Sequence, residues 1–227
     1  MEDAGFLDRY DPADYDRPSV AVDCVALGMI DGTLGVLLAR RDRPPFAGDW
    51  ALPGGFVGID ESLEAAAGRV LHDKAGLSGG SPEQVHCFGA VDRDPRMRII
   101  SIAYRVLLDP ARMAAVRLRD DQCWAPLDPA GRRDVRLAFD HDRIVALTLD
   151  RLRATIDDAA FALLPERFTL RELQAVHEAV LGRPLNKPAF RRRMLERGVL
   201  HPTGTFETGR AFRPAELYIH IPKGPPW

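Results

Sequence analysis

The stretch GFVGIDESLEAAAGRVLHDKAGL, residues 55–77, constrains the fold of this 227-residue chain more than any other. It opens on a glycine turn, and a segment with one apolar face at helical spacing follows. Gly76 then stands where a helix is expected to end, because glycine adopts the left-handed conformation of a helix C-terminus at low cost. We therefore expect a loop, a helix with one buried face and a second loop at fixed offsets.

This stretch resembles the Nudix box, in which a glycine is followed six residues later by a glutamate and then by the run Arg-Glu-aliphatic-x-Glu-Glu-x-Gly-aliphatic. The run from Trp50 to Val57 that leads into it resembles the same family. The resemblance implies an α/β Nudix fold, with a mixed sheet between helices. The residues that match the box are Gly55, Glu61, Arg69, Leu71, Gly76 and Leu77.

Three positions of the box depart from an active Nudix hydrolase, in which glutamates on one helix face hold divalent metal against a pyrophosphate. They are Val70, Asp73 and Lys74 in this chain. Hard cations need oxygen ligands, so only Asp73 can still bind a metal directly. We expect that hydrolysis is lost, that no cofactor is required and that Mg²⁺ binds weakly at most. Weak residual hydrolysis stays open as an alternative, because Glu61, Glu64 and Asp73 could hold one ion poorly.

A Nudix fold without its carboxylates still offers a pocket, and a second run points to its ligand. Residues 88–96 and 101–104 resemble Nudix proteins that handle ADP-ribose, and more closely the NrtR-type Nudix-related regulators. The alternatives are a solvated hairpin tip and an exposed helix pair between Arg69 and Asp73. The planar guanidinium group of arginine can donate two hydrogen bonds to one phosphate, which favours contact between the arginines of this run and a phosphate-containing ligand. The expected ligand-binding residues are Trp50, Gly54, Gly55, Phe56, Arg69, Asp73, Arg93 and Arg96.

Four strands and one further helix are expected around the box. Residues 20–29 and 34–39 are strand candidates joined by the turn dipeptide Asp31-Gly32, and 85–91 and 99–108 are two more. A helix opens within 137–144 and extends to about Ala154. His141 at its start is interpreted as a capping or packing residue, since a lone histidine there is rarely catalytic.

The pattern changes to helices near Leu164. Thr169 and Glu172 form a capping box, in which each side chain satisfies an amide of the first helical turn. Gly182 ends that helix, Asn186 caps a second one and Gly198 follows it. Helix, short turn and helix, followed by strand candidates, indicate a winged helix-turn-helix with its wing turn at 204–209.

The second helix of this unit is the expected reader of DNA, because that helix enters the major groove in helix-turn-helix proteins. Phe190, Met194 and Leu195 define its buried stripe, while Arg192 and Arg193 point away from it. A solvated charged face is the alternative. The expected DNA-binding residues are Thr169, Arg171, Asn186, Lys187, Arg191, Arg192 and Arg193.

Residues 169–200 closely resemble the C-terminal domain of NrtR-type regulators. The resemblance implies a homodimer on a palindromic operator of double-stranded DNA, repressing NAD-biosynthesis genes until ADP-ribose or a related nucleotide binds. Relatives of the same architecture sense sugars, and a working Nudix hydrolase with a basic accessory domain is the alternative from another class. We expect an N-terminal arm (residues 1–18), a Nudix-like domain (19–156) and a winged-helix domain (157–227).

Charge and cysteine content agree with this division. Residues 164–227 hold 11 Lys and Arg against 6 Asp and Glu, a net charge of +5 that leaves −7 for residues 1–163. A basic part beside an acidic body is typical of a module that meets nucleic acid. Cys24, Cys87 and Cys123 lack CxxC spacing, so we expect reduced core thiols. Without an apolar signal or a run of about 18 apolar residues, a cytoplasmic protein without membrane contact is expected.

Overall fold

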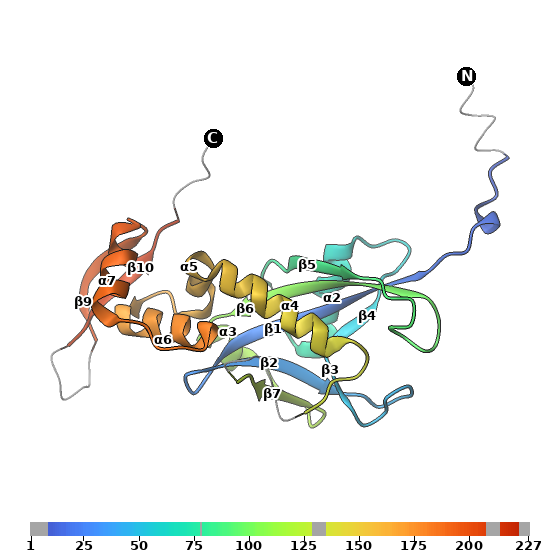
Figure 1. Cartoon of the computed structure of the whole chain (residues 1–227), viewed down its shortest axis with the longest axis horizontal. Coiled ribbons are helices and arrows are strands. Elements are labelled where there is room, and N and C mark those ends of the chain that lie inside the picture. The colour runs from blue at the N-terminus through green and yellow to red at the C-terminus, as the bar shows by residue number, and fades with distance from the viewer. Residues whose placement is uncertain (1–8, 78, 129–134, 208–213, 223–227) are drawn as a thin grey trace, which may run out of the picture.

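The computed structural model describes residues 9–77, 79–128, 135–207 and 214–222. The molecule is elongated, with a body built on a large sheet at one end and a smaller helical unit with its own sheet at the other (Figure 1). Within the described residues, no helix is both long enough and apolar enough to cross a bilayer.

The large sheet has seven strands and is mixed. Its main order is β3-β2-β1-β6-β5, with β4 also paired to β1 and β7 to β2. Among the described strands of this sheet, β1 and β6 alone run parallel, in an unbroken register from Ser19 opposite Ile99 to Gly28 opposite Leu108, and the other pairs are antiparallel. The strands are β1 (Ser19–Ile30), β2 (Thr33–Arg40), β3 (Trp50–Ala51), β4 (Gly54–Phe56), β5 (Glu83–Phe88), β6 (Ile99–Leu108) and β7 (Gln122–Pro126).

The expected hairpin between the first two strands is confirmed. Asp31 and Gly32 have φ values of 46° and 81°, and Ile30 pairs directly with Thr33 across the turn. Two positive φ values in a two-residue loop give the twist that flanking strands need, and Asp-Gly adopts them readily.

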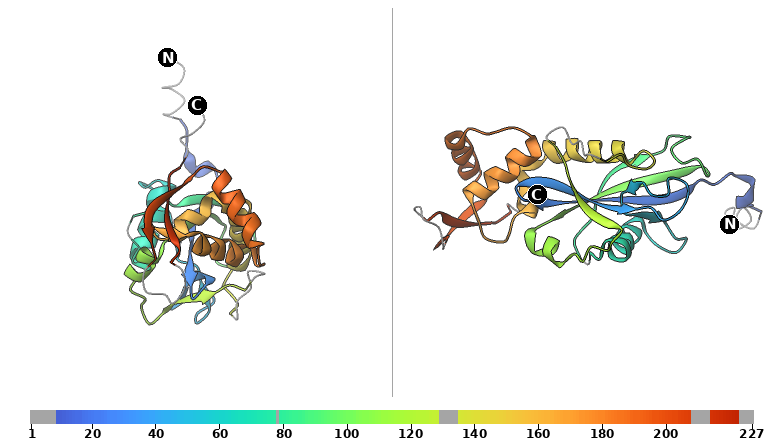
Figure 2. Two further views of the ribbon diagram at one scale, coloured as in Figure 1. Left: turned by 90° about the vertical axis from the view of Figure 1, so that its left-hand side faces the viewer. Right: turned by 90° about the horizontal axis from the view of Figure 1, so that it is seen from below.

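Helices cover both faces of this sheet, as the view from below shows (Figure 2). Helix α2 (Leu63–Ala75) buries Ala66, Ala67, Val70 and Leu71 against one face, and α3 (Pro110–Ala115) lies on the same side. Helix α4 (His141–Ala154) covers the other face. The predicted Nudix-type arrangement of a mixed sheet between helices is therefore confirmed, and Gly76 ends α2 with a φ of 64°.

The C-terminal unit contains both predicted helices and their caps. The Thr169 hydroxyl accepts from the Glu172 N–H and the Glu172 carboxylate accepts from the Thr169 N–H, so the capping box is present. Asn186 accepts from Ala189 N–H at 3.0 Å and caps the second helix. Helices α5 (Ile156–Ala159) and η2 (Ala160–Leu163) lead into this unit, and η1 (Pro12–Asp14) precedes the body. The elements of the C-terminal unit itself are β8 (Phe168–Thr169), α6 (Leu170–Leu181), α7 (Lys187–Glu196), β9 (Leu200–Phe206) and β10 (Glu216–His220).

One apolar core joins this unit to the body. Leu173 of α6 and Met194 of α7 belong to the same buried cluster as Val25 of β1 and Leu149 of α4. Helix α6 also contacts β2 and α4 directly. The two units therefore share one close-packed interior.

Four local predictions are wrong. Leu195 is 43% exposed, because Phe190 and Met194 already fill the side of α7 that faces the core. Gly204 lies within β9 and not in the wing turn, and residues 208 and 209 of that predicted turn lie outside the described part of the chain. Cys87 is exposed and Cys123 half-buried, so only Cys24 is a core thiol.

Candidate ligand pocket and nucleic-acid interface

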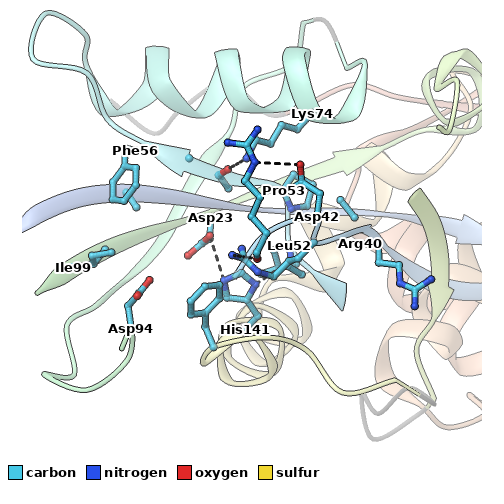
Figure 3. A pocket seen from close by; sticks show the side chains of 18 of the residues that line it. Asp23, Arg40, Asp42, Leu52, Pro53, Phe56, Lys74, Asp94, Ile99 and His141 are labelled. Carbon is cyan, nitrogen blue, oxygen red and sulfur yellow. Dashed lines mark hydrogen bonds and ion pairs between the residues drawn. The ribbon is translucent and has the colours of Figure 1, made fainter. Parts of the chain in front are cut away.

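A cavity of about 550 Å³ opens beside the C-terminal end of α2 (Figure 3). Its walls come from β4, the end of β3, the loop after β2, the loop between β5 and β6 and the start of α4. Segments far apart in the sequence therefore meet around one space. Its volume lies in the usual range for small-molecule sites, which is roughly 300–1,000 Å³.

Gly54 fixes one wall because no larger residue fits there. Strand β4 pairs with β1 so that Gly54 lies opposite Asp23, and a Cβ atom on Gly54 would lie 2.2 Å from the Asp23 Oδ1 atom. The missing side chain lets the β4 backbone approach the Asp23 carboxylate. The Gly54 carbonyl then accepts a hydrogen bond from Lys74 Nζ at 2.5 Å, which ties the end of α2 to β4.

The floor of the pocket is a buried network of charged side chains. The Arg93 side chain is 4% exposed and donates to Asp140 from Nη2 at 2.6 Å and from Nε at 3.1 Å. Arg93 Nη2 also lies 3.4 Å from the Asp23 carboxylate, which accepts from Ser101 Oγ at 2.5 Å. Arg93 is thus neither a solvated hairpin tip nor a free fork for phosphate, because two carboxylates already occupy it.

His141 closes this floor from the start of α4. Its Nδ1 atom accepts a hydrogen bond from the Leu52 N–H at 3.0 Å, and its Nε2 atom lies 3.4 Å from the Asp23 carboxylate. Burial lowers the pKa of His141, although Asp23 and Asp140 act in the opposite direction. The predicted packing role fits this position, and the neutral ring orients the backbone of Leu52.

The lowered pKa of His141 gives a pH prediction. In the unfolded chain His141 binds a proton with the ordinary histidine pKa of 6.5, whereas in the folded chain it does so with a lower pKa. The contribution of the neutral His141 to the free energy of unfolding is therefore fully present above pH 6.5 and is lost as the pH falls below it. We expect the free energy of unfolding in urea to drop between about pH 7.5 and 5.5, with His141 adding up to about 1.4 kcal/mol per pH unit. His141→Gln keeps an acceptor for Leu52 and should reduce this slope. An unchanged slope in that variant would contradict the assignment.

Aromatic rings and a tethered arginine form the open side. Phe56 is 48% exposed, and the Arg96 guanidinium lies 5.8 Å from the ring centroids of both Phe56 and Phe139. Asp94 accepts from Arg96 at 2.7 Å and 3.0 Å, which holds the guanidinium there. Flat apolar surfaces beside a cation suit a heteroaromatic ring.

The structure brings six of the eight predicted ligand residues to the pocket wall and leaves two out. Trp50 faces a second cavity with Cys123 and Trp124, because neighbouring strand residues point to opposite sides and Ala51 takes the pocket side. Arg69 pairs with Glu61 and donates to the Phe56 carbonyl at 2.9 Å, away from the lining. The six are Gly54, Gly55, Phe56, Asp73, Arg93 and Arg96.

The ion pair of Arg69 also decides the alternative of an exposed pair between Arg69 and Asp73. Its partner is Glu61 and not Asp73, and the hydrogen bond from Arg69, with one from the Gly58 N–H, lowers the pKa of Glu61 to about 2. The pair connects the loop before α2, which contains Glu61, to the helix itself. The Glu61 carboxylate is therefore used to hold this loop against α2.

Several lining residues escaped the sequence reasoning. Asp23 carried a usable signal, since a carboxylate inside an apolar strand is seldom buried without a partner. The others gave no local signal, because they reach the pocket only through the tertiary fold. The lining residues that were missed include Asp23, Arg41, Lys74, Phe139 and His141.

The donor set on α2 does not fit a divalent metal. Val70 is 1% exposed and offers no oxygen, Lys74 brings a cation, and Asp73 Oδ1 lies 3.0 Å from His72 Nδ1. In the part of the chain that the structure describes, no three His, Cys, Asp or Glu side chains gather as a metal site. Glu64, the other carboxylate on α2, is not part of the pocket lining. Hard cations need several oxygen ligands at once, so Asp73 alone is too little.

The predicted DNA-reading helix α7 presents part of its charge to solvent. Lys187, Arg191 and Arg192 are exposed, and among the described residues no carboxylate lies within ion-pair distance of them. These three cations stay free to meet phosphates or base edges. Asn186 is exposed as well, but its side chain is used as the helix cap.

Three other residues predicted to contact DNA are engaged within the protein. Arg193 Nη1 lies 2.5 Å from the Asp157 carboxylate of α5, although the Arg193 side chain is 48% exposed. Arg171 pairs with Glu207 at 2.8 Å. Thr169 is 1% exposed, so its side chain serves the capping box and cannot reach DNA in this conformation.

Comparison with known proteins finds relatives for both units. The family model described as NUDIX domain matches residues 17–147, and the one described as NrtR DNA-binding winged helix domain matches residues 160–219. The ADPR responsive transcriptional repressor NtrR of Acinetobacter baylyi is 37% identical over 218 residues, which are 94% of this chain and 86% of that protein.

Two solved structures of the Shewanella oneidensis protein NrtR are also similar. One is its complex with a 27mer DNA, with a TM-score of 0.73 and 35% identity, covering 89% of this chain and 93% of that one. The other is its NUDIX domain complexed with ADP ribose, with a TM-score of 0.57 and 34% identity, covering 67% of this chain and 99% of that one.

Proposed function

Because this chain belongs to the NrtR family of Nudix-related transcriptional regulators, we propose that it is a ligand-responsive repressor that binds an operator and senses ADP-ribose or a related nucleotide. The observation that carries the proposal is the packing of a cationic, aromatic-walled pocket and a winged-helix unit on one apolar core. Residues 19–156 form the sensing domain and 157–227 the DNA-binding domain, in the cytoplasm. The genes it controls are those of NAD biosynthesis.

The ligand is assigned by the chemistry of the pocket. Phe56 and Phe139 offer ring faces for a base, and Lys74, Arg41 and Arg96 offer cations for phosphates. The Acinetobacter relative is named for its response to ADPR, and the similar Shewanella domain was crystallised with ADP ribose. Both names support ADP-ribose over the sugar that other regulators of this architecture sense.

A homodimer is part of the proposal. One winged helix offers few cations and gives weak, sequence-independent binding, so selecting one operator needs two copies on half-sites about 10 base pairs or a multiple apart. The acidic body, at −7 for residues 1–163, is repelled by DNA and lies away from the duplex. It is placed to set the distance between the two reading helices.

Gel shifts on a palindromic site from a NAD-metabolism promoter test the function. We expect specific binding that ADP-ribose weakens, because a ligand preferring one arrangement of the two units shifts the equilibrium toward it. Thermal denaturation should show stabilisation of about 2.7 kcal/mol at roughly 100 times the Kd. NAD and pentose phosphates serve as comparison ligands. If only a sugar phosphate stabilises the protein, the effector is wrong; without specific DNA binding, the repressor assignment fails.

We expect no hydrolysis of ADP-ribose with Mg²⁺ or Mn²⁺, because Val70 and Lys74 replace two metal-binding carboxylates of the family motif. Product formation is followed by chromatography of AMP. Binding of ADP-ribose to the same preparation is the control, since it shows that the substrate reaches the pocket. Turnover in the ordinary enzyme range of roughly 1–10³ s⁻¹ would contradict the prediction, and slow cleavage would indicate a bifunctional protein.

A further inference from the structure

Two neighbouring cations of the pocket, Lys74 and Arg41, have no carboxylate partner among the described residues. Lys74 Nζ donates to the Gly54 carbonyl at 2.5 Å, and Arg41 donates to the carbonyls of Pro45 at 2.8 Å and Arg43 at 3.3 Å. In the described structure neither lies within ion-pair distance of an Asp or Glu. This distinguishes them from four other lining cations that are each paired with a carboxylate, which are Arg43, Arg93, Arg96 and Arg119. Arg40 also has no carboxylate within ion-pair distance in the described structure, but its Nε donates to the Gly48 carbonyl at 2.8 Å and its side chain points away from Lys74 (Figure 3).

The positive charge of these two groups is concentrated in one place. Partial burial lowers the pKa of Lys74 and Arg41 lowers it further, although Asp23 and Asp42 act in the opposite direction. Burial also lowers the pKa of Arg41, followed by the charge of Arg96. Cations that disfavour one another in the free protein are relieved by a bound anion, so the pocket is electrostatically prepared for a ligand with more than one negative charge.

The position of Lys74 gives this charge a specific meaning. It stands in the box helix where the family motif has the last of its metal-binding glutamates, and the remaining donors do not fit a metal. In this chain the Lys74 ammonium group of α2 therefore supplies a positive charge to the pocket. In the family motif a metal ion bound by the glutamates would supply that charge. Lys74 uses one of its three N–H donors on Gly54 and keeps two for a ligand.

We infer that Lys74, assisted by Arg41, takes the place of the divalent metal and binds the pyrophosphate of a nucleoside diphosphate ligand directly, so that binding needs no metal. The inference rests on the proposed function for the identity of the ligand as ADP-ribose. It adds the group that recognises the pyrophosphate and the independence from metal.

Calorimetry of the full chain with ADP-ribose tests both parts. In EDTA and in excess Mg²⁺ we expect the same Kd within about twofold, because the charge that Mg²⁺ would supply is already covalently present. Lys74→Gln should weaken ADP-ribose binding about tenfold or more, the loss expected for a hydrogen bond to a charged group. Lys74→Arg keeps the charge and should retain most of the affinity.

Adenosine and a distant variant supply the controls. Adenosine lacks the pyrophosphate, so Lys74→Gln should leave its binding unchanged, whereas a merely structural defect would weaken both ligands. Arg151→Gln removes an exposed cation from α4, ten residues beyond His141, and should leave the Kd for ADP-ribose unchanged. Thermal denaturation confirms that each variant is folded.

The outcomes separate the inference from the proposed function. If the wild-type protein binds no ADP-ribosyl compound, the ligand of the proposed function is wrong. If it binds ADP-ribose only with Mg²⁺, or equally well after Lys74→Gln, then ADP-ribose sensing stands and the role of Lys74 is overturned. Loss of affinity in Lys74→Gln for adenosine as well as ADP-ribose overturns the pyrophosphate contact.

Discussion

Arg192→Ala is expected to reduce discrimination between the operator and a mismatched site by about 1–3 kcal/mol, or roughly 5- to 150-fold, if the guanidinium reads a guanine edge. Arg192 is exposed on α7 and free of ion pairs among the described residues, so its guanidinium is available to a base. Fluorescence anisotropy with the operator and a mismatched duplex measures the ratio of the two Kd values. Lys187→Ala should instead weaken all sequences alike and lower the salt slope by about one.

Arg193→Ala is the matched control for this experiment. It removes the same kind of side chain from the next position of the same helix, but Arg193 is bound to Asp157. Its removal should therefore change DNA affinity less than the removal of Arg192. A larger loss of discrimination in Arg193→Ala than in Arg192→Ala would show that Asp157 releases Arg193 on DNA and that Arg192 is not the reader.

The two neighbouring arginines also show where sequence reasoning stops. The helical period correctly placed Phe190 and Met194 in the core, because the burial of an amphipathic helix follows its own stripe. It could not say which element covers the flank of that stripe. Helix α5 supplies Asp157 there, and Arg193 forms an exposed ion pair with that carboxylate. The contact of Arg193 with DNA stays a prediction.

Elements with local chemical signals were predicted well. The Asp31-Gly32 turn, the Thr169 capping box and the Gly76 and Gly182 helix ends each depend on residues within a few positions of one another. Their conformations are set by backbone sterics and by short-range hydrogen bonds, which the sequence displays directly. The order of the strands and the parallel pairing of β1 with β6 were not predicted, because these strands are far apart in the sequence and meet only in the tertiary fold.

The residues of the pocket were harder to predict from the sequence, because its charged side chains interact across long sequence separations. Arg69 and Lys74 both lie on the box helix, and nothing local says that Arg69 will fold back onto Glu61 while Lys74 reaches β4. Trp50 was predicted as a pocket wall from its closeness in sequence to the glycine turn. The alternation of strand β3 sends it to the other side, and a shift of one residue decides that outcome.

Arg93→Met should lower the free energy of unfolding by about 3–5 kcal/mol, because it leaves two buried carboxylates without their cation. Arg93 is the shared partner of Asp140, on α4, and Asp23, on β1, and all three side chains are largely buried. Asp140 makes no helix-capping hydrogen bond with its side chain, so its carboxylate serves Arg93. Urea denaturation at neutral pH measures the loss, and a loss below about 1 kcal/mol would contradict a buried network.

The compensating variant decides whether charge or shape causes that loss. Asp23→Asn and Asp140→Asn in the Arg93→Met background remove the unpaired charges and should recover most of the stability, since replacing a whole buried ion network by neutral groups is often tolerated. If the triple variant is as unstable as Arg93→Met, packing is responsible. If it recovers, the arginine joins the ligand pocket to the start of α4 by charge, at the end of the helix opposite to α5 and Asp157. A ligand that disturbs Arg93 would then act on α4, which contacts α5 and α6 of the C-terminal part of the chain.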